Sequence, residues 1–268
     1  MDEELAGCVI AAMDGADARL VRHLPYILQD FREIGTSAEM VAALVAKHRR
    51  PAQPAVLDLG CGKGAVSVRL AADGCRCLGI DAVAGFVEAA RALAQEAGVS
   101  GLCTFEVGDI RRRVASLPAF DVIVLGAIGP VFGDHRRTLT TLAPLLTDGG
   151  FVVIDDAYTA GVCADTPASD GIPSRSELLS LAAAAGMTLL DEAVIPTTPE
   201  LLAAYDAEFA AFSRRCLELA GRFPEDAGIL LRYVEDQREA YRVLACGVIN
   251  AVLVFARRQG ITGLRTEP

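Results

Sequence analysis

The fold of this chain is decided by the stretch Val56-Leu-Asp-Leu-Gly-Cys-Gly-Lys-Gly-Ala65, in which an apolar run ends in a glycine-rich loop. A short apolar run of this kind is typical of a buried strand, and the pattern of Val66–Ala72 predicts a helix. The glycines let a ligand approach the backbone, and the first turn of the helix offers unpaired amides. The stretch therefore predicts a strand, a nucleotide-type binding loop and a helix in succession.

Downstream of this stretch, short apolar runs alternate with longer amphipathic ones. This alternation is typical of a parallel sheet with helices on both faces, so we expect a doubly wound α/β fold. Strands are predicted at Ala55–Leu59, Arg76–Ile80, Cys103–Val107, Phe120–Leu125, Gly150–Ile154, Thr188–Ile195 and Ile249–Ala256. Helices are predicted between them at Val66–Ala72, Phe86–Ala97, Arg136–Leu146 and Ser176–Ala185.

Two further segments carry apolar and aromatic residues that should pack on something. Upstream, Leu24–Phe31 is too apolar for a free tail, and Thr36 and Glu39 have the spacing of a capping box at a helix start. Downstream, Pro199 and Pro224 begin two helices before the last strand, either as a structural hairpin or as a substrate cover. The expected division is one domain over residues 1–268, with an N-terminal helical cover at 1–50 and a helical insertion at 197–245.

The composition of the chain limits the kinds of partner that it can bind. The chain has 268 residues, with 25 Lys and Arg against 35 Asp and Glu, and the net charge of −10 would repel a phosphate backbone, so we expect no nucleic acid partner. Its eight cysteines show no zinc-ligand spacing, which favours reduced thiols and no metal site. Met1-Asp-Glu-Glu lacks the positive start of a signal peptide, and Val243 to Ala256 is too short to span a bilayer. We therefore expect a cytoplasmic protein; its oligomeric state stays open, with a dimer among the options.

The glycine loop fits two kinds of ligand. Gly60, Gly62 and Ala65 stand at the three spacings of the dinucleotide-binding fingerprint. Asp58 discriminates between the ligands, because a carboxylate beside the loop would repel a pyrophosphate but attract an ammonium and a sulfonium. The loop therefore favours S-adenosylmethionine over a nicotinamide dinucleotide.

Two more acids follow the next two predicted strands. Asp81 ends the second strand, where a carboxylate can accept hydrogen bonds from both ribose hydroxyls. Asp109 follows the third strand and could receive the adenine amino group, with Ile110 against the ring. Three acids at the ends of three successive strands strengthen the prediction of S-adenosylmethionine.

From Pro54 to Ile154 the sequence resembles the class I S-adenosylmethionine-dependent methyltransferase family, through the glycine motif, Asp81, Gly108-Asp109-Ile110 and Phe120-Asp-Val-Ile-Val-Leu-Gly126. The resemblance implies a Rossmann-like, mostly parallel, seven-stranded sheet whose antiparallel last strand lies beside the sixth, with the cofactor across the strand ends. The segment before the first strand and the helical insertion look like the small-molecule branch that includes ubiquinone/menaquinone-type relatives. The cofactor-binding residues implied are Asp58, Gly60, Cys61, Gly62, Gly64, Asp81, Ala82, Gly108, Asp109, Ile110 and Gly126.

Candidate catalytic residues follow the fourth and fifth strands. Methyl transfer from a sulfonium needs mainly alignment and exclusion of water, and a base helps only if the acceptor must lose a proton. His135, in the loop after the fourth strand, is a candidate base, with a plain surface histidine as the alternative. Asp155, Asp156 and Tyr158 end the fifth strand, where they could hold a cationic or metal-bridged acceptor or merely cap the next segment.

The chain departs from one motif of the resembling family. Its amino methyltransferases that act on bases carry Asn/Asp-Pro-Pro-aromatic after the fourth strand, whereas this chain reads Gly126-Ala-Ile-Gly-Pro130. The difference argues against an adenine or glutamine amine as the acceptor.

Aromatic residues of the two flanking segments are the candidate walls of a substrate site, namely Tyr26, Tyr205, Phe209 and Tyr233. They could stabilise a cation, or they could only pack the helices together. We therefore predict methyl transfer from S-adenosylmethionine to a small molecule. The alternatives are a nicotinamide-dependent oxidoreductase and a non-catalytic module that binds S-adenosylmethionine.

Overall fold

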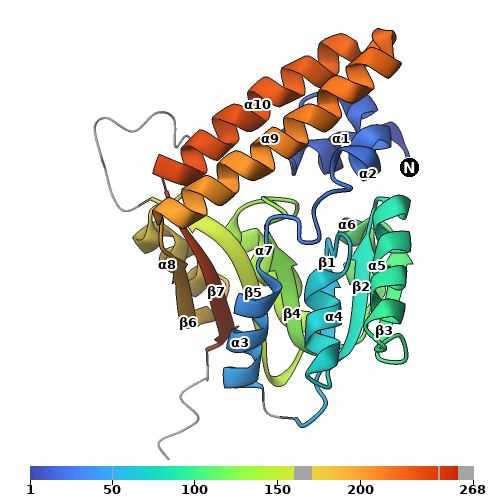
Figure 1. Cartoon of the computed structure of the whole chain (residues 1–268). Coiled ribbons are helices and arrows are strands. Elements are labelled where there is room, and N and C mark those ends of the chain that lie inside the picture. Colours follow the sequence, from blue (N-terminus) through green and yellow to red (C-terminus); the bar gives the residue numbers. More distant parts are fainter. Residues whose placement is uncertain (50, 160–170, 247, 259–268) are drawn as a thin grey trace, which may run out of the picture.

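A computed structural model describes residues 1–49, 51–159, 171–246 and 248–258 (Figure 1). Seven strands form one sheet in the order β3-β2-β1-β4-β5-β7-β6. Strands β1 to β5 pair in parallel, and β7 is antiparallel to both β5 and β6, as predicted for the last strand. The strands are β1 (Ala55–Leu59), β2 (Arg76–Asp81), β3 (Cys103–Val107), β4 (Phe120–Gly126), β5 (Leu146–Tyr158), β6 (Met187–Ile195) and β7 (Ile249–Arg257).

Helices cover both faces of the sheet because the strand side chains alternate between two apolar clusters. Leu57 and Ile123 face α6, α7 and α8, while Val56 and Val122 on the same strands face α3 and α4. Helix α5 packs beside α4 against β3. The helices are α1 (Glu3–Ala11), α2 (Leu24–Ile27), α3 (Ala38–His48), α4 (Ala65–Ala72), α5 (Ala84–Glu96), α6 (Ile110–Arg113), α7 (His135–Leu142), α8 (Arg175–Ala184), α9 (Pro199–Arg222) and α10 (Ala227–Cys246).

The fifth strand is longer than predicted, since β5 runs from Leu146 to Tyr158 rather than from Gly150 to Ile154. Three other predicted boundaries are wrong for a local reason. The helix predicted to reach Leu146 ends at Leu142, because Pro144 lies in a 3-10 turn and Leu146 already begins β5. Ser37, not Thr36, caps α3, since its hydroxyl accepts from the amide of Met40. The turn that Pro224 leads is a 3-10 helix, and α10 begins three residues later at Ala227.

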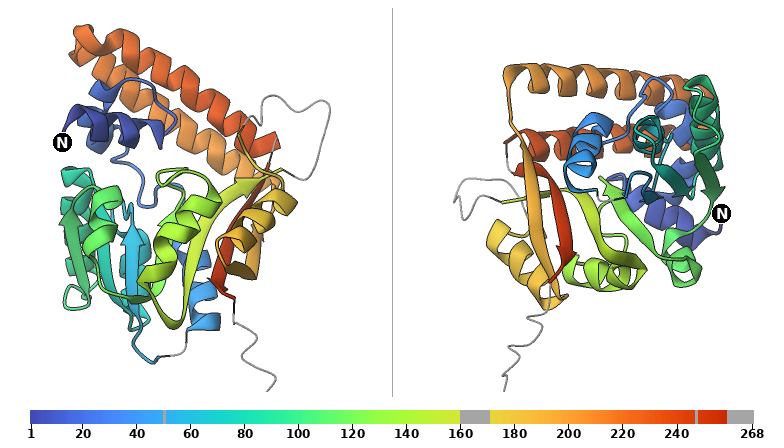
Figure 2. Two further views of the ribbon diagram at one scale, coloured as in Figure 1. Left: turned by 180° about the vertical axis from the view of Figure 1, so that it is seen from behind. Right: turned by 90° about the horizontal axis from the view of Figure 1, so that it is seen from below.

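A separate helical layer lies at the ends of the strands. Figures 1 and 2 show α9 and α10 side by side across the top of the sheet, with α1 and α2 against them. Leu24, Ile27, Phe212 and Leu230 form one apolar cluster in this layer, which also takes in Phe86 from α5. Within the described part of the chain, no helix is long and apolar enough to cross a membrane.

Two polar contacts fix the N-terminal segment in this layer. His23 Nε2 lies 2.8 Å from the buried carboxylate of Asp226, between α9 and α10. Lys63, in the glycine loop, donates to the backbone carbonyls of Leu28 and Phe31. The segment after α2 therefore lies directly on the loop after β1.

Candidate cofactor and acceptor site

The glycine loop has a backbone that only glycine accommodates. Gly60, Gly62 and Gly64 have φ angles of +72°, +51° and +78°, in the left-handed region. A Cβ on Gly60 would lie 2.6 Å from Cγ2 of Ile128, and one on Gly64 would lie 2.7 Å from Cβ of Ala90. The loop after β1 is therefore a close-packed backbone cradle at the start of α4.

Asp81 links this cradle to the end of β2. Its Oδ2 accepts from the Gly62 amide at 2.9 Å, and its Oδ1 accepts from the Val83 amide at 2.8 Å. The carboxylate is 9% exposed, and burial raises its pKa. Each oxygen keeps a free lone pair, so the group could still accept hydrogen bonds from a ribose. Ala82 follows it on the same turn.

Asp58 lies deeper than the sequence suggested. Its carboxylate is 2% exposed and accepts from the Ser67 hydroxyl of α4 at 2.6 Å. Burial raises its pKa to about 6. Burial also raises the pKa of the neighbouring Cys61 thiol, which stays neutral. Asp58 is therefore almost closed to direct contact with a ligand.

Asp109 is already paired after β3. It caps α6 and accepts from the Arg111 amide at 3.0 Å and from Arg111 Nη2 at 2.9 Å, which lowers its pKa. The Gly108 amide donates to the Asp81 carbonyl at 2.9 Å, and Ile110 is buried in the sheet core. An adenine amino group bound here would share Asp109 with a guanidinium.

The ends of β4 and β5 form a different environment. Asp155 is 8% exposed and Thr36 is 5% exposed, yet Asp155 Oδ2 and Thr36 Oγ1 have no hydrogen-bond partner among the described residues. Burial raises the pKa of Asp155 to about 7; Thr36 lowers this pKa, while the charge of Asp156 raises it. Gly126 makes room for Thr36, because a Cβ there would lie 2.7 Å from the Thr36 hydroxyl.

His135 lies beside these acids. It is the first residue of α7, which Asp134 caps, rather than a loop residue as predicted. Its Nε2 lies 3.1 Å from Asp156 Oδ2 without the geometry of a hydrogen bond. The structure therefore brings His135 next to Asp156. Asp155 precedes Asp156 on β5, so its side chain points to the other face of the strand, where Thr36 lies.

Of the candidate aromatic walls, Tyr205 is the one whose pKa responds to the charge of Asp155. The charges of Glu208 and Asp155, after burial, raise its pKa. Its ring meets that of Tyr241 edge-on, with the centroids 5.6 Å apart, and Phe209 meets Tyr241 at 5.9 Å. These three rings lie on α9 and α10.

The other three tyrosines bond elsewhere. The Tyr26 hydroxyl donates to Glu218 at 2.7 Å, the Tyr158 hydroxyl to Glu192 at 2.6 Å, and the Tyr233 hydroxyl to the Met13 carbonyl at 3.0 Å. Tyr158 and Tyr233 are almost fully buried. Their rings pack the layers together, and their hydroxyls are taken up by other groups of the protein.

Sequence reasoning missed four residues of this region, namely Thr36, Lys63, Glu208 and Tyr241. The sequence could have indicated Lys63, because this residue lies inside the glycine motif. The other three come from segments distant in sequence, and no motif marks them. Only their packing at the strand ends reveals them.

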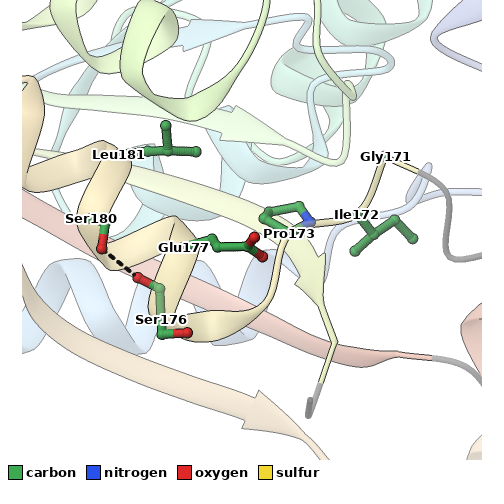
Figure 3. Close-up of a pocket in the computed structure, with 7 residues that line it drawn as sticks. All are labelled: Gly171, Ile172, Pro173, Ser176, Glu177, Ser180 and Leu181. Atoms are coloured by element: carbon green, nitrogen blue, oxygen red, sulfur yellow. Dashed lines mark hydrogen bonds between the residues drawn. The ribbon is translucent and has the colours of Figure 1, made fainter. Parts of the chain in front are cut away.

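A hollow of about 630 Å³ lies elsewhere, at the start of α8 (Figure 3). Pro173, Ser176 and Leu181 are among the residues that line it. The carboxylate of Glu177, which also lines it, is taken up by the amide and hydroxyl of Ser174. No predicted site residue borders this hollow, so it carries none of the chemistry above.

The described residues contain no group of three or more His, Cys, Asp or Glu side chains that could hold a metal ion. Of the eight cysteines, Cys163 and the side chain of Cys246 lie outside the description. The six others are free thiols, four of them buried.

The sheet order, with its antiparallel β7 between β5 and β6, defines the class I methyltransferase fold. Two solved structures show this fold similarity over most of their length. A SAM-dependent methyltransferase from Geobacter sulfurreducens, in complex with S-adenosyl-L-homocysteine, matches with a TM-score of 0.71 and 21% identity over 88% of this chain and 98% of that one. YjhP from E. coli matches with a TM-score of 0.72 and 20% identity, over 88% and 100%.

The sequence comparisons concern the glycine-loop half. Residues 56–150 match the family described as "Methyltransferase domain". The "Uncharacterized methyltransferase YcgJ" of Bacillus subtilis (strain 168) is 32% identical over 111 residues, 41% of this chain and 41% of that protein. A "Probable tocopherol O-methyltransferase, chloroplastic" of Oryza sativa subsp. japonica is 33% identical over 100 residues, which are 37% of this chain and 28% of that protein. The matches thus span less than half of this chain and of these two relatives. The match to the methyltransferase domain family is likewise confined to residues 56–150.

Proposed function

We propose that this protein transfers a methyl group from S-adenosylmethionine to a small-molecule acceptor. The observation that carries the proposal is the cradle of Gly60, Gly62 and Gly64, held by Asp81 through the Gly62 amide. Gly60 and Gly64 leave no room for a side chain against Ile128 and Ala90. A loop backbone without side chains allows close approach, which suits the amino-acid part of the cofactor. When bound, S-adenosylmethionine supplies an activated methyl group on a sulfonium.

The cofactor roles of the other residues follow the strand ends. Asp81 would accept the ribose hydroxyls, and Gly108, Asp109 and Ile110 would surround the adenine. Cys61 and Ala82 would border the loop and the ribose, and Gly126 would separate the cofactor from the acceptor. Asp58 would hold the loop through Ser67 and favour a cation by its field.

The acceptor would lie over the ends of β4 and β5. His135, Asp155 and Asp156 lie there, and Tyr205 and Phe209 would wall the site from above. The chain's own residues would orient the acceptor and exclude water, which is most of what such a displacement requires. We also propose that residues 1–50 and 197–245 cover this site within one domain; cytoplasmic location, the absence of a metal and membership of the ubiquinone/menaquinone-type branch remain predictions.

Thermal unfolding with ligands tests the proposal. S-adenosylhomocysteine should raise the melting temperature, because a ligand that binds only the native state stabilises it. NAD serves as the control, since it also carries adenine and ribose but adds a pyrophosphate. A shift with NAD and none with millimolar S-adenosylhomocysteine would favour the oxidoreductase alternative instead. Binding without methyl transfer to any acceptor would favour the non-catalytic module.

A further inference from the structure

The acids over the ends of β4 and β5 have no arginine or lysine partner in the described part of the chain. Several acids elsewhere in the molecule do have one: Asp30 pairs with Arg214 and Arg215, Asp109 with Arg111, Asp191 with Lys47, and Asp226 with Arg22. Among the ion pairs of the described residues, none involves Asp155 or Glu208, and Asp156 has only His135. Negative charge is therefore left uncompensated at this place.

The α9–α10 hairpin brings aromatic side chains toward these acids. Burial, with the charges of Glu208 and Asp155, raises the pKa of Tyr205 on α9. The Tyr241 hydroxyl of α10 donates to Glu208 Oε2 at 3.4 Å. On the same hairpin, Arg238 lies over the ring of Phe209. The hairpin therefore brings Tyr205 within electrostatic range of Asp155.

A second and independent observation points to a ligand. Asp155 is more than nine-tenths buried, and its Oδ2 has no hydrogen-bond partner within the described residues. The equally buried Thr36 hydroxyl also lacks a partner with hydrogen-bond geometry, although it lies close enough to Asp155 to lower the pKa of that carboxyl. Buried polar atoms are nearly always paired, and an unpaired buried carboxyl is costly. A bound molecule with hydrogen-bond donors would supply the missing partner.

We propose that the methyl acceptor is a small aliphatic amine that binds as a cation with its N–H group on Asp155 Oδ2. This inference rests on the proposed function. An ammonium offers several donors, enough for Asp155 and the Thr36 hydroxyl together, and its charge compensates the Asp155 carboxylate. The ring of Tyr205 adds a cation–π surface. A carboxylate or phosphate acceptor would be repelled here, and an alcohol would leave the charge uncompensated.

The same contact gives the nitrogen its lone pair. The ammonium transfers one proton to the Asp155 carboxylate, and the freed lone pair forms a bond to the methyl carbon. The carbon–sulfur bond breaks, and its electron pair stays on sulfur, which becomes neutral. The product is an N-methylammonium beside a protonated Asp155, so charge and protons balance. Water and bulk buffer recover that proton when the product leaves.

Matched probe molecules test the inference by binding alone. The probes are propylamine, phenethylamine and tryptamine, each compared with the alcohol and the carboxylate of the same carbon skeleton. Calorimetry on the full chain saturated with S-adenosylhomocysteine should show at least one amine bound tenfold or more tightly than its two analogues. Asp155→Asn should remove this preference at least tenfold and leave S-adenosylhomocysteine binding unchanged.

Asp148→Asn is the matched control. It removes the same negative charge as Asp155→Asn, but at the opposite, exposed end of β5. It should leave the amine preference intact. The inference is overturned if no amine binds more tightly than its alcohol, or if the preference survives in Asp155→Asn. Failure of the parent protein to bind S-adenosylhomocysteine would instead overturn the proposed function. With methyl-labelled S-adenosylmethionine, mass spectrometry should find the label on nitrogen of the bound amine.

Discussion

The acids that follow β1, β2 and β3 differ in hydrogen bonding from the acid at the end of β5. We call these two groups of strand ends the first and the second half of the site. After β1, β2 and β3, every acid is satisfied by the protein: Asp58 by Ser67, Asp81 by two amides, and Asp109 by Arg111. After β5, Asp155 is buried with one oxygen unpaired. The first half is preorganised by its own hydrogen bonds. In the second half, a carboxyl oxygen of Asp155 has no partner, and a bound ligand could supply one.

Under the proposed function, the strand ends with satisfied acids hold the cofactor, and the end of β5 holds the acceptor. A satisfied backbone cradle costs nothing to keep ready, so it can serve one constant ligand. An uncompensated carboxyl is costly by itself, and such perturbed groups concentrate at functional sites. The family match ends at residue 150, just before the unsatisfied half begins.

The largest expected effect is on the pH dependence of stability. Asp155 keeps its proton in the folded protein up to pH about 7, but in the unfolded chain only up to its ordinary pKa of 3.8. The folded state therefore binds more protons between these values, and its stability falls as pH rises through that window. Asp155→Asn should abolish this part of the decrease in the free energy of unfolding, which is roughly 4 kcal/mol as an upper limit.

Urea unfolding of both proteins between pH 4 and 8 measures this difference. Asp58, with a folded pKa of about 6, adds a fall of the same sign up to that pH in both proteins. The gap between the two should therefore keep widening from pH 6 to 7. A constant gap would mean that Asp155 is satisfied like the acids of the other half.

The next effect tests the satisfied half through Asp81→Ala. The change removes the acceptor of the Gly62 and Val83 amides as well as the ribose contact. We expect S-adenosylhomocysteine to bind about a hundredfold more weakly, because bonds to a charged group are worth roughly 1.5–3 kcal/mol each. Asp81→Asn, which keeps an acceptor oxygen, should lose less. Calorimetry that finds parent-like affinity for Asp81→Ala would refute the ribose assignment.

A smaller effect separates packing from backbone strain in the cradle. Gly60→Ala and Gly98→Ala both force alanine into positive φ, at +72° and +71°, at a cost of roughly 1–2 kcal/mol. Only at Gly60 does the new Cβ meet another side chain, that of Ile128, since Gly98 faces open space. Both variants should melt lower than the parent. Only Gly60→Ala should lose affinity for S-adenosylhomocysteine, by about tenfold, and equal affinities would show that the cradle does not touch the ligand.

The smallest effect concerns the helical layer. Tyr233→Phe removes the hydroxyl bond to the Met13 carbonyl and keeps the ring against Phe212. It should lower the free energy of unfolding by about 1 kcal/mol and change neither cofactor nor amine binding. Tyr205→Phe is the comparison, because that hydroxyl lies near Asp155. A binding defect in Tyr233→Phe would place this tyrosine nearer the site than its burial suggests.

Much of the satisfied half could be predicted from the sequence. The glycine loop, the strand before it and the antiparallel last strand were predicted, and the fold and family comparisons confirm them. The sequence did not indicate that Asp58 turns away from the ligand surface toward Ser67. Nor did it reveal that Tyr158 and Tyr233 pack inward, since an aromatic at helical or strand spacing serves a core and a site equally well.

The sequence by itself determined the local elements: the strands, the loop that needs glycines at positive φ, and the order in which they follow one another. The tertiary structure decided which distant residues meet. Thr36 lies beside Asp155 because Gly126 has no side chain to exclude it. Tyr205 comes within electrostatic range of the same carboxyl because the α9–α10 hairpin packs on the N-terminal helices. The physical reason is that φ/ψ preference and side-chain periodicity act over a few residues. Burial and charge compensation, in contrast, depend on contacts that exist only after the layers have packed.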